Sequence, residues 1–427
     1  MSLRPLLDLA TDDEAYLAVA DATRSGGATA RVSGAIQPYV VAALAEDALA
    51  GRPLLVVVAD DVAAREFARD LRAYLAPRAV RHYPSRGTGY ASQVAPSPHL
   101  VGLRIAALDA LAGRSAADGG APVVVASAIA LAETVPEPDL RPEGFELRVG
   151  EDIDLDFAAE LLVDAGYERV DQVEARGQFA IRGDILDVFP ATEDRATRIE
   201  LFGDEIESMR WFSTFTQRSL GEIDAVELAP AAELASEHRE AAALALDDEE
   251  SERPPIAELV PVDRFRAPLE MISADTAVVI AGEEDIEPAL RDHWDDVTAA
   301  MHTDDARRFY VDVAGPLTER AALRLRAPRD TEGGASEPTI RAQAAVSAAR
   351  SLAEAEGQLE RELGSGYRVV VAFEHRGEAE RSRFNLKRLS ARLLDGAPPG
   401  PDGQWPAELA FAEASLSEGF VAPSLRL

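Results

Sequence analysis

Three carboxylates in one short stretch could do chemistry: Asp184, Asp187 and Glu200. Clustered carboxylates can hold a magnesium ion and support metal-dependent hydrolysis. Asp184 falls at an expected turn, however, where acidic residues are common for backbone reasons. Asp187 and Glu200 alternate with apolar neighbours, which predicts that both point to the solvent face of a strand. A divergent magnesium-dependent nuclease is therefore kept as an alternative, although the chain's single lysine, Lys387, lies far from these acids in the sequence.

A phosphate-binding loop is the second chemistry to look for. Such a loop needs glycines for close approach of the backbone, a lysine for the phosphates and a hydroxyl for magnesium. Residues 31–39, at the expected position, read RVSGAIQPY, without a lysine and with Pro38 near the critical point. The glycine-rich residues 85–90 (SRGTGY) also lack a lysine and are typical of a surface turn. We therefore expect no ATP hydrolysis by this chain.

Other catalytic and metal-binding patterns are missing. The six histidines are scattered without helical ligand spacing, and the chain has no cysteine, which fits a reducing cytoplasm. Residues 182–184 match the Arg-Gly-Asp adhesion tripeptide, but the start of the chain lacks a signal-peptide core and no apolar run is long enough to cross a membrane. We expect no catalytic residue, no metal, no cofactor and no membrane contact.

Composition points towards a protein partner. The 427 residues predict two to four domains, and 47% hydrophobic with 28% charged residues is typical of a globular protein. The net charge of −33 repels phosphate and disfavours general nucleic-acid binding. A basic protein surface is an easier partner for so acidic a chain.

Exposed arginines are the best candidates for binding. In residues 178–182 the alternation sends Phe179 to one face and Gln178 and Arg182 to the other. Arg169 lies just upstream, and Arg176 is on the intervening turn. Arginines are favoured anchors at protein interfaces, although solvated arginines on an acidic surface would look the same.

The expected elements divide the chain into parts. Residues 1–143 alternate helices with short, wholly apolar runs, which is typical of a parallel sheet with buried strands. Residues 144–228 predict a small antiparallel α+β insert with one helix. The βα pattern resumes over 229–328, so the insert interrupts one α/β domain. Its predicted strands cover 178–182, 185–189, 197–202 and 206–212.

Residues 329–338 have the composition of a linker. A smaller α/β domain follows over 339–427, with helices predicted over 342–363 and 378–394 and a strand over 367–373. The chain stops on an apolar, strand-like segment, which predicts a truncated domain.

Residues 167–219 resemble the UvrA-binding domain shared by the repair protein UvrB and the transcription-repair coupling factors (Mfd). The resemblance rests on VDQV at 170–173, the Arg-Gly pair at 182–183 and FGDEIESMRWFSTFTQRS at 202–219. The decayed phosphate loop favours the coupling factors, which carry a degenerate helicase-like (RecA-like) domain. The motif residues expected to be structural are Phe179, Gly183, Phe189, Phe202, Asp204 and Glu205.

The resemblance implies that Arg169 and Arg182 contact UvrA, with Arg176 and Gln178 beside them. A third arginine of the family falls on Ala180, so that contact is absent. It also implies that the chain recruits UvrA to RNA polymerase stalled at a DNA lesion. An intramolecular contact with the missing C-terminal region would restrain the full-length motor, an ATP-dependent DNA translocase. Polymerase and DNA would be reached only through the missing parts. A stand-alone regulatory paralogue is a further possibility.

Overall fold

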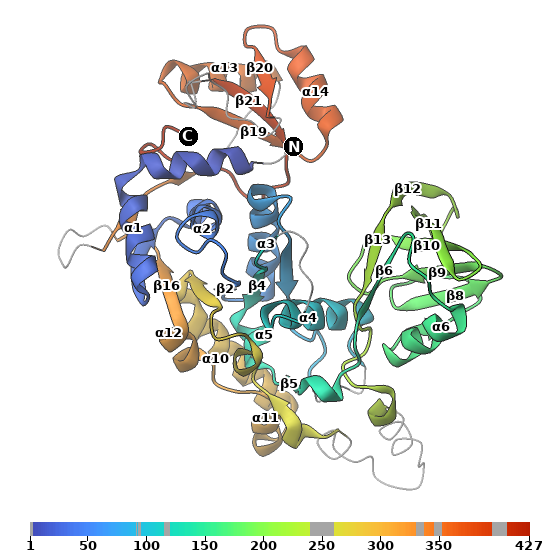
Figure 1. Cartoon of the computed structure of the whole chain (residues 1–427). Helices are drawn as coiled ribbons and strands as arrows, with labels where there is room; N and C mark the ends of the chain where they lie inside the picture. The colour runs from blue at the N-terminus through green and yellow to red at the C-terminus, as the bar shows by residue number, and fades with distance from the viewer. Residues whose placement is uncertain are drawn as a thin grey trace.

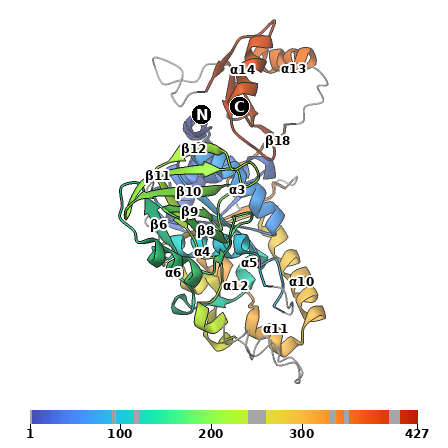
Figure 2. The same cartoon turned by 90° about the vertical axis from the view of Figure 1, so that its right-hand side faces the viewer.

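The computed structural model describes residues 3–90, 92, 95–114, 120–239, 260–329, 337–345, 352–394 and 408–427. A layered α/β body forms the centre, an antiparallel insert lies to one side of it, and a C-terminal module lies at one end (Figure 1). The turned view in Figure 2 shows the insert in front of the body and the module again at the same end. Among the described helices, none has the length and apolar character needed to span a membrane.

A seven-stranded parallel sheet is the core of the body. Its order is β17-β1-β16-β15-β2-β4-β3, and β2, β4 and β15 are buried at every position, as wholly apolar runs predict. Because β15 follows the insert in sequence yet lies between β2 and β16, the chain returns to the same sheet. The strands are β1 (Ala28–Val32), β2 (Leu54–Val58), β3 (Val80–Tyr83), β4 (Val123–Ser127), β15 (Ala277–Ala281), β16 (Ala321–Arg326) and β17 (Thr339–Ile340).

Helices cover both faces of this sheet. One apolar cluster joins η1, α1, α2 and α3 to one face, and a second joins α4, α5, α9, α10 and α12 to the other. The elements are η1 (Arg4–Asp12), α1 (Glu14–Ser25), η2 (Gly34–Ile36), α2 (Gln37–Glu46), α3 (Asp61–Leu75), α4 (Pro98–Leu111), α5 (Ala128–Ala132), η3 (Pro138–Leu140), η4 (Val262–Arg264), α9 (Pro268–Met271), α10 (Glu283–Ala300), α11 (Thr303–Phe309) and α12 (Ala314–Arg320). β5 (Val135–Pro136) pairs with β14 (Phe265–Arg266) beside them.

Side-chain caps explain where several helices begin. Asp13, Asp60 and Ser97 precede α1, α3 and α4, and Asp154 precedes α6 (Leu155–Asp164) of the insert. Each accepts a hydrogen bond from a backbone N–H of the first turn. Such a cap satisfies a donor that the helix itself leaves unpaired and stabilises the helix by about 1 kcal/mol.

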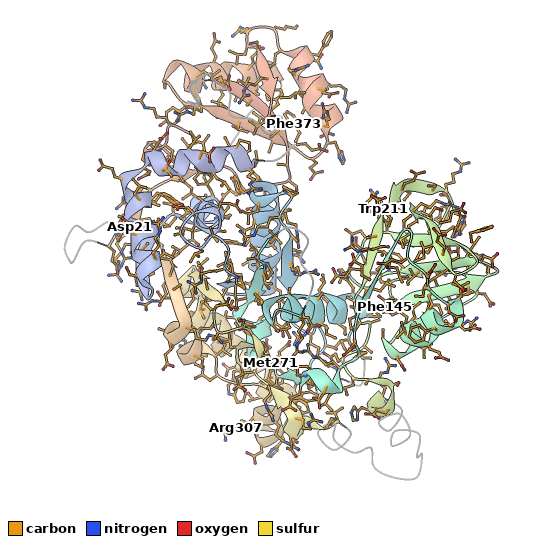
Figure 3. The ribbon with its side chains drawn as sticks, viewed as in Figure 1. Asp21, Phe145, Trp211, Met271, Arg307 and Phe373 are labelled. Atoms are coloured by element: carbon orange, nitrogen blue, oxygen red, sulfur yellow. The ribbon has the colours of Figure 1, made fainter. Side chains whose placement is uncertain are left out.

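The insert is a six-stranded sheet of order β12-β11-β10-β9-β8-β7, covered on one face by α6. Its pairs are antiparallel except β7 with β8, which are parallel. A short β6–β13 ribbon links the sheet to the body (Figure 3, where Phe145 marks the start of β6). The elements are β6 (Phe145–Arg148), α6 (Leu155–Asp164), β7 (Glu168–Arg169), β8 (Gln178–Arg182), β9 (Ile185–Phe189), β10 (Ala196–Phe202), β11 (Glu205–Phe212), β12 (Ser219–Ile223) and β13 (Ala225–Leu228). The expected α/β fold with an antiparallel α+β insert is confirmed.

Close packing and one buried ion pair fix the insert and its return segment to the body. A methyl group added to Gly102 on α4 would lie 2.6 Å from the Cβ of Ala191, so the helix approaches the insert closely there. Nearby, Arg104 binds the buried Glu133 at 2.6 Å, and Arg86 binds Glu233, just after the insert, at 2.8 Å. Burial raises the pKa of Glu133. The contact of Gly102 with Ala191 holds the insert on the body, and the Arg86–Glu233 pair holds its return segment. The Arg104–Glu133 pair lies within the body beside them.

The C-terminal module differs from its sequence prediction in two places. Residues 343–344 are strand β18, paired with β22, and not the start of a helix. The helix expected over 378–394 ends at Asn385, because the carboxylate of Glu356 accepts hydrogen bonds from the backbone N–H groups just beyond it and turns the chain towards β20. The elements are β18 (Gln343–Ala344), α13 (Leu352–Gly364), β19 (Val369–Phe373), α14 (Arg376–Asn385), β20 (Ala391–Leu393), β21 (Leu409–Glu413) and β22 (Phe420–Val421).

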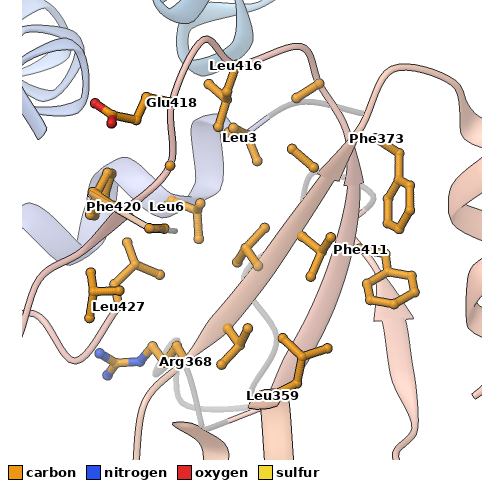
Figure 4. Close-up of a pocket in the computed structure, with 18 of the residues that line it drawn as sticks. Leu3, Leu6, Leu359, Arg368, Phe373, Phe411, Leu416, Glu418, Phe420 and Leu427 are labelled. Carbon is orange, nitrogen blue, oxygen red and sulfur yellow. The ribbon is translucent and has the colours of Figure 1, made fainter. Parts of the chain in front are cut away.

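The module is attached to the body by its C-terminal segment. Asp70 on α3 accepts hydrogen bonds from the backbone N–H, at 2.6 Å, and the hydroxyl of Ser417. Between the module and η1 lies an apolar cavity of about 830 Å³. Its labelled apolar side chains come from the start of the chain through η1, from helix α13 and strands of the module, and from the C-terminal segment (Figure 4): Leu3, Leu6, Leu359, Phe373, Phe411, Leu416, Phe420 and Leu427.

His82, on the edge strand β3, makes the stability of the body depend on pH. Burial lowers its pKa from 6.5 to about 4. The unfolded chain therefore takes up this proton near pH 6.5, whereas the folded chain does so only near pH 4, so stability present above pH 6.5 is lost as the pH falls between these values. We expect the wild type to lose about 2 kcal/mol more than His82→Gln between pH 7 and pH 5, measured by urea denaturation. Equal losses would contradict this.

Candidate protein-docking surface

A tight hairpin presents Arg182. Arg182 ends β8, Ile185 begins β9 opposite it, and Gly183 and Asp184 form the turn between them. Gly183 has a φ of +60°, a left-handed conformation that glycine adopts without steric cost. The motif glycine is thus needed for the turn that carries the arginine.

The two faces of the insert's sheet have different chemistry. The inner face, against α6, is apolar and includes the fully buried Phe179. The opposite face carries charged side chains and is here called the outer face. Alternation therefore placed Phe179 and Arg182 correctly, and the Arg182 side chain is 50% exposed. The outer-face charges come from four neighbouring strands, β8 to β11: Arg182, Asp187, Arg198, Glu200 and Arg210.

Asp187 corrects an expectation. It lies on the outer face, as alternation predicts, but it is 1% exposed and not in solvent. Arg198, its cross-strand partner, binds its two carboxylate oxygens at 2.6 and 2.8 Å, and Arg182 binds it at 2.6 Å. A second apolar cluster around Phe212 covers part of this face, and the Arg198 guanidinium lies 4.7 Å from the Phe212 ring. Arginine side chains therefore bury the carboxylate that the sequence placed in water.

The carboxylates of the insert do not form a metal site. Arg210 binds both oxygens of Glu200, and its hydrogen bonds are the main cause of the lowered pKa of Glu200. Asp184 stands apart, exposed in the hairpin turn. Over all residues that the structure describes, no group of three acidic or histidine side chains could hold a metal ion. The nuclease alternative using Asp184, Asp187 and Glu200 gains no support from this arrangement.

Arg169 lies on the other side of the sheet's edge from Arg182. It is exposed on β7 and stands opposite Phe179 in the parallel β7–β8 register. Laterally paired residues point to the same face, so Arg169 projects on the Phe179 side, whereas Arg182 is on the outer face. A partner that contacts both must reach around the β7–β8 edge.

Arg176 and Gln178 are held by neighbouring groups of the insert. Arg176 binds Asp194 at 2.5 Å and lies 5.4 Å from the ring of Phe189. The Gln178 side chain accepts hydrogen bonds from the backbone N–H groups of residues 174 and 175 and donates one to Glu168 at 3.1 Å. Both side chains shape the loop that joins β7 to β8.

Most of the remaining motif residues lie in the turn between β10 and β11. Phe202, Gly203, Asp204 and Glu205 form the β10–β11 hairpin, with Gly203 at a φ of +67°. Phe202 was expected to be structural, yet it is 78% exposed. Sequence reasoning also missed Arg198 and Arg210 as partners of the carboxylates, because only the cross-strand register brings those pairs together.

The decayed phosphate-loop position is engaged by the chain beyond the linker. The backbone N–H of Ser33 donates to the carbonyl of Ile340 at 3.1 Å, and its hydroxyl accepts from the N–H of Ala342 at 3.1 Å. Gln37 is buried, and its amide donates to the carbonyl of Val32. The Ser33 backbone N–H, the Ser33 hydroxyl and the Gln37 amide at this turn thus already have protein partners.

Comparison with known proteins first gives the class of the insert. Residues 145–234 match the family model described as the UvrB interaction domain. That segment contains the whole six-stranded sheet, including both hairpins of the outer face. The chain therefore carries a UvrB-like interaction module within a larger α/β body.

Comparison with curated relatives then extends the similarity into the body. The chain is 33% identical over 206 residues to the transcription-repair-coupling factor of Bacillus subtilis, which covers 48% of this chain and 17% of that protein. It is 35% identical over 258 residues to the coupling factor of Mycobacterium tuberculosis, covering 56% and 21%. UvrABC system protein B of Prochlorococcus marinus is 32% identical over 194 residues, covering 42% and 28%. The resemblance to coupling factors with a UvrB-like module is confirmed, and the matches cover about a fifth of those coupling factors' length.

Removing Arg198 is expected to destabilise the insert more than removing Arg182. Arg198→Ala leaves the buried Asp187 with one partly exposed partner and should cost about 3 kcal/mol. Arg182→Ala removes a half-exposed ion pair and should cost about 1 kcal/mol or less. Chemical denaturation of both variants tests the order. Adding Asp187→Ala to Arg198→Ala should recover part of the loss, since no buried charge then lacks its main partner. Equal costs for the two arginines would contradict the assignment.

Proposed function

We propose that this chain recruits UvrA during transcription-coupled nucleotide excision repair, as the N-terminal part of a transcription-repair coupling factor. One observation carries the proposal: residues 145–234 match the UvrB interaction domain, and this domain presents an exposed Arg169 and a half-exposed Arg182 at one edge of its sheet. Guanidinium groups in such positions can form bidentate bonds with carboxylates of a partner.

The charge of the chain supports a protein partner over DNA. A net charge of −33 opposes binding to phosphates, so DNA and RNA polymerase would be engaged by other parts of the parent protein. In this proposal the chain works in the cytoplasm and brings UvrA to polymerase stalled at a lesion. An intramolecular contact between this region and the C-terminal part of the parent would restrain the motor until UvrA is needed.

Charge changes at the β7–β8 edge test the proposal. We expect Arg169→Glu and Arg182→Ala each to weaken binding of the 427-residue chain to purified UvrA at least tenfold. Arg182→Ala removes an interface arginine, which can contribute about 2 kcal/mol, and Arg169→Glu reverses a charge at the interface. Calorimetry or biolayer interferometry measures the affinity. Arg182→Ala is preferable to Arg182→Glu, because a glutamate there would place a second carboxylate beside the buried Asp187.

Arg291→Glu is the matched control for Arg169→Glu. Arg291 is 63% exposed on α10, away from the insert, so the same change of charge should leave UvrA binding unaltered. If the Arg169→Glu/Arg182→Ala double variant bound UvrA as tightly as wild type, the docking surface would be wrongly assigned.

We also propose that this chain has no ATPase activity of its own. The turn at Ser33 has no lysine, and its N–H and hydroxyl groups are bonded to the segment at 340–342. Titration with magnesium-ATP should give no heat of binding, and incubation should release no phosphate above a buffer blank. A known phosphate-loop ATPase serves as the positive control. Hydrolysis by this chain that a Ser33→Ala change abolished would refute the proposal.

A further inference from the structure

Phe202 is an exposed aromatic side chain without a role in the core of the insert. It is 78% exposed, whereas the next residue inward on β10, Leu201, is 6% exposed and belongs to the inner apolar cluster. An exposed phenylalanine gains none of the roughly 2 kcal/mol that burial of such a side chain supplies to folding. A role for the Phe202 ring must therefore be sought in contacts with another molecule and not in the stability of the insert.

Phe202 and Arg182 lie at the same end of the sheet. The β8–β9 hairpin and the β10–β11 hairpin turn at this end, and the backbone N–H of Leu201 donates to the carbonyl of Asp184 at 2.9 Å. This hydrogen bond holds the two turns side by side. The two motif turns therefore form one continuous tip.

Phe202 and Arg182 also share a face. Ile199 and Leu201 are both in the inner cluster, so alternation along β10 sends Glu200 and Phe202 to the outer face. The register shift in this hairpin leaves Glu207 on β11 without a partner and does not disturb the alternation of β10. An aromatic ring, a half-exposed guanidinium and the Arg210–Glu200 pair are thus neighbours on one surface.

We propose that Phe202 is the apolar anchor of the surface that UvrA covers, with Arg182 as its charged neighbour. The proposal rests on the proposed function and names a further residue of the same site. Buried aromatic and arginine side chains supply most of the free energy at protein interfaces, surrounded by polar contacts that exclude water. UvrA would offer an apolar pocket for the ring, with a carboxylate at its rim for the guanidinium.

Phe202 also indicates which face of the sheet UvrA would cover, which the two edge arginines alone do not indicate. Phe202 places the centre of the contact on the outer face at the tip of the two hairpins. Arg169, which projects on the other side of the β7–β8 edge, then lies at the rim. Truncating Phe202 should therefore weaken binding at least as much as removing Arg169.

The test is the affinity of the 427-residue chain for purified UvrA. Phe202→Ala should weaken binding at least tenfold, and Phe202→Leu should recover part of the loss. The melting temperature of both variants should stay at the wild-type value, because the ring is exposed. Two controls remove an exposed phenylalanine elsewhere: Phe157→Ala on α6, which covers the inner face, and Phe384→Ala on α14, which is 89% exposed. Both should bind as wild type does.

The outcomes separate this inference from the proposed function. Wild-type affinity in Phe202→Ala, while Arg169→Glu and Arg182→Ala lose binding, would overturn the anchor and leave the docking edge intact. An equal loss of UvrA binding in Phe157→Ala would indicate a contact on the α6 side of the sheet and would also overturn the proposed anchor role of Phe202. Absence of UvrA binding by the wild type would instead overturn the proposed function, and this inference with it.

Discussion

The buried carboxylate of Asp187 is the constraint on which the outer face of the insert depends. A carboxylate that is 1% exposed must be compensated, and here the compensation comes from Arg198 on β10 and Arg182 at the end of β8. The two ion pairs cross from β9 to both neighbouring strands and so fix their register. They also orient the Arg182 guanidinium before any partner arrives, which lowers the entropy that binding must cost. In the proposed docking of UvrA, the Asp187 carboxylate would thus serve both the folding of the sheet and the positioning of Arg182.

The near absence of lysine has a structural counterpart. The carboxylates of Asp187 and Glu200 are each bound through both oxygens by one guanidinium, a geometry that the planar fork of arginine provides and an ammonium group does not. On the central strand β16, two arginines share one carboxylate: Arg324 and Arg326 each bind a different oxygen of Glu283. Arginine-based pairs let polar residues stand on strands that would otherwise have to be apolar.

The sequence was sufficient to predict the strands whose apolar or turn pattern lies within the strand itself and its adjacent turns. The apolar runs of β2, β4 and β15 and the turn residues around β8 and β9 predict these strands because burial and turn chemistry are both visible in the sequence. β16 escapes prediction because its alternate arginines depend on Glu283, far away in sequence. The end of α14 likewise depends on Glu356, which lies on another helix.

In the candidate docking surface, too, the features set by one strand were predictable and those set by several strands were not. Alternation along β8 places Arg182 correctly, since it needs only the pleat of one strand. The burial of Asp187 and the exposure of Phe202 could not be predicted, because both follow from which strands are neighbours and where two hairpins meet. Alternation within one strand predicts the face on which each side chain lies. The neighbours of that side chain depend on how the strands pair in the folded sheet.

The pairing of β17 with β1 has a consequence for dissecting the chain. By composition the polypeptide should divide at residues 329–338, yet Thr339 and Ile340, directly after that stretch, complete the edge of the central sheet. Cutting there would leave one side of β1 with unpaired N–H and C=O groups along Arg31 and Val32, a template for pairing with a second molecule. A monomeric fragment of the body should therefore retain the chain through residue 342. The central sheet of the body therefore extends to residues after the linker-like composition of 329–338.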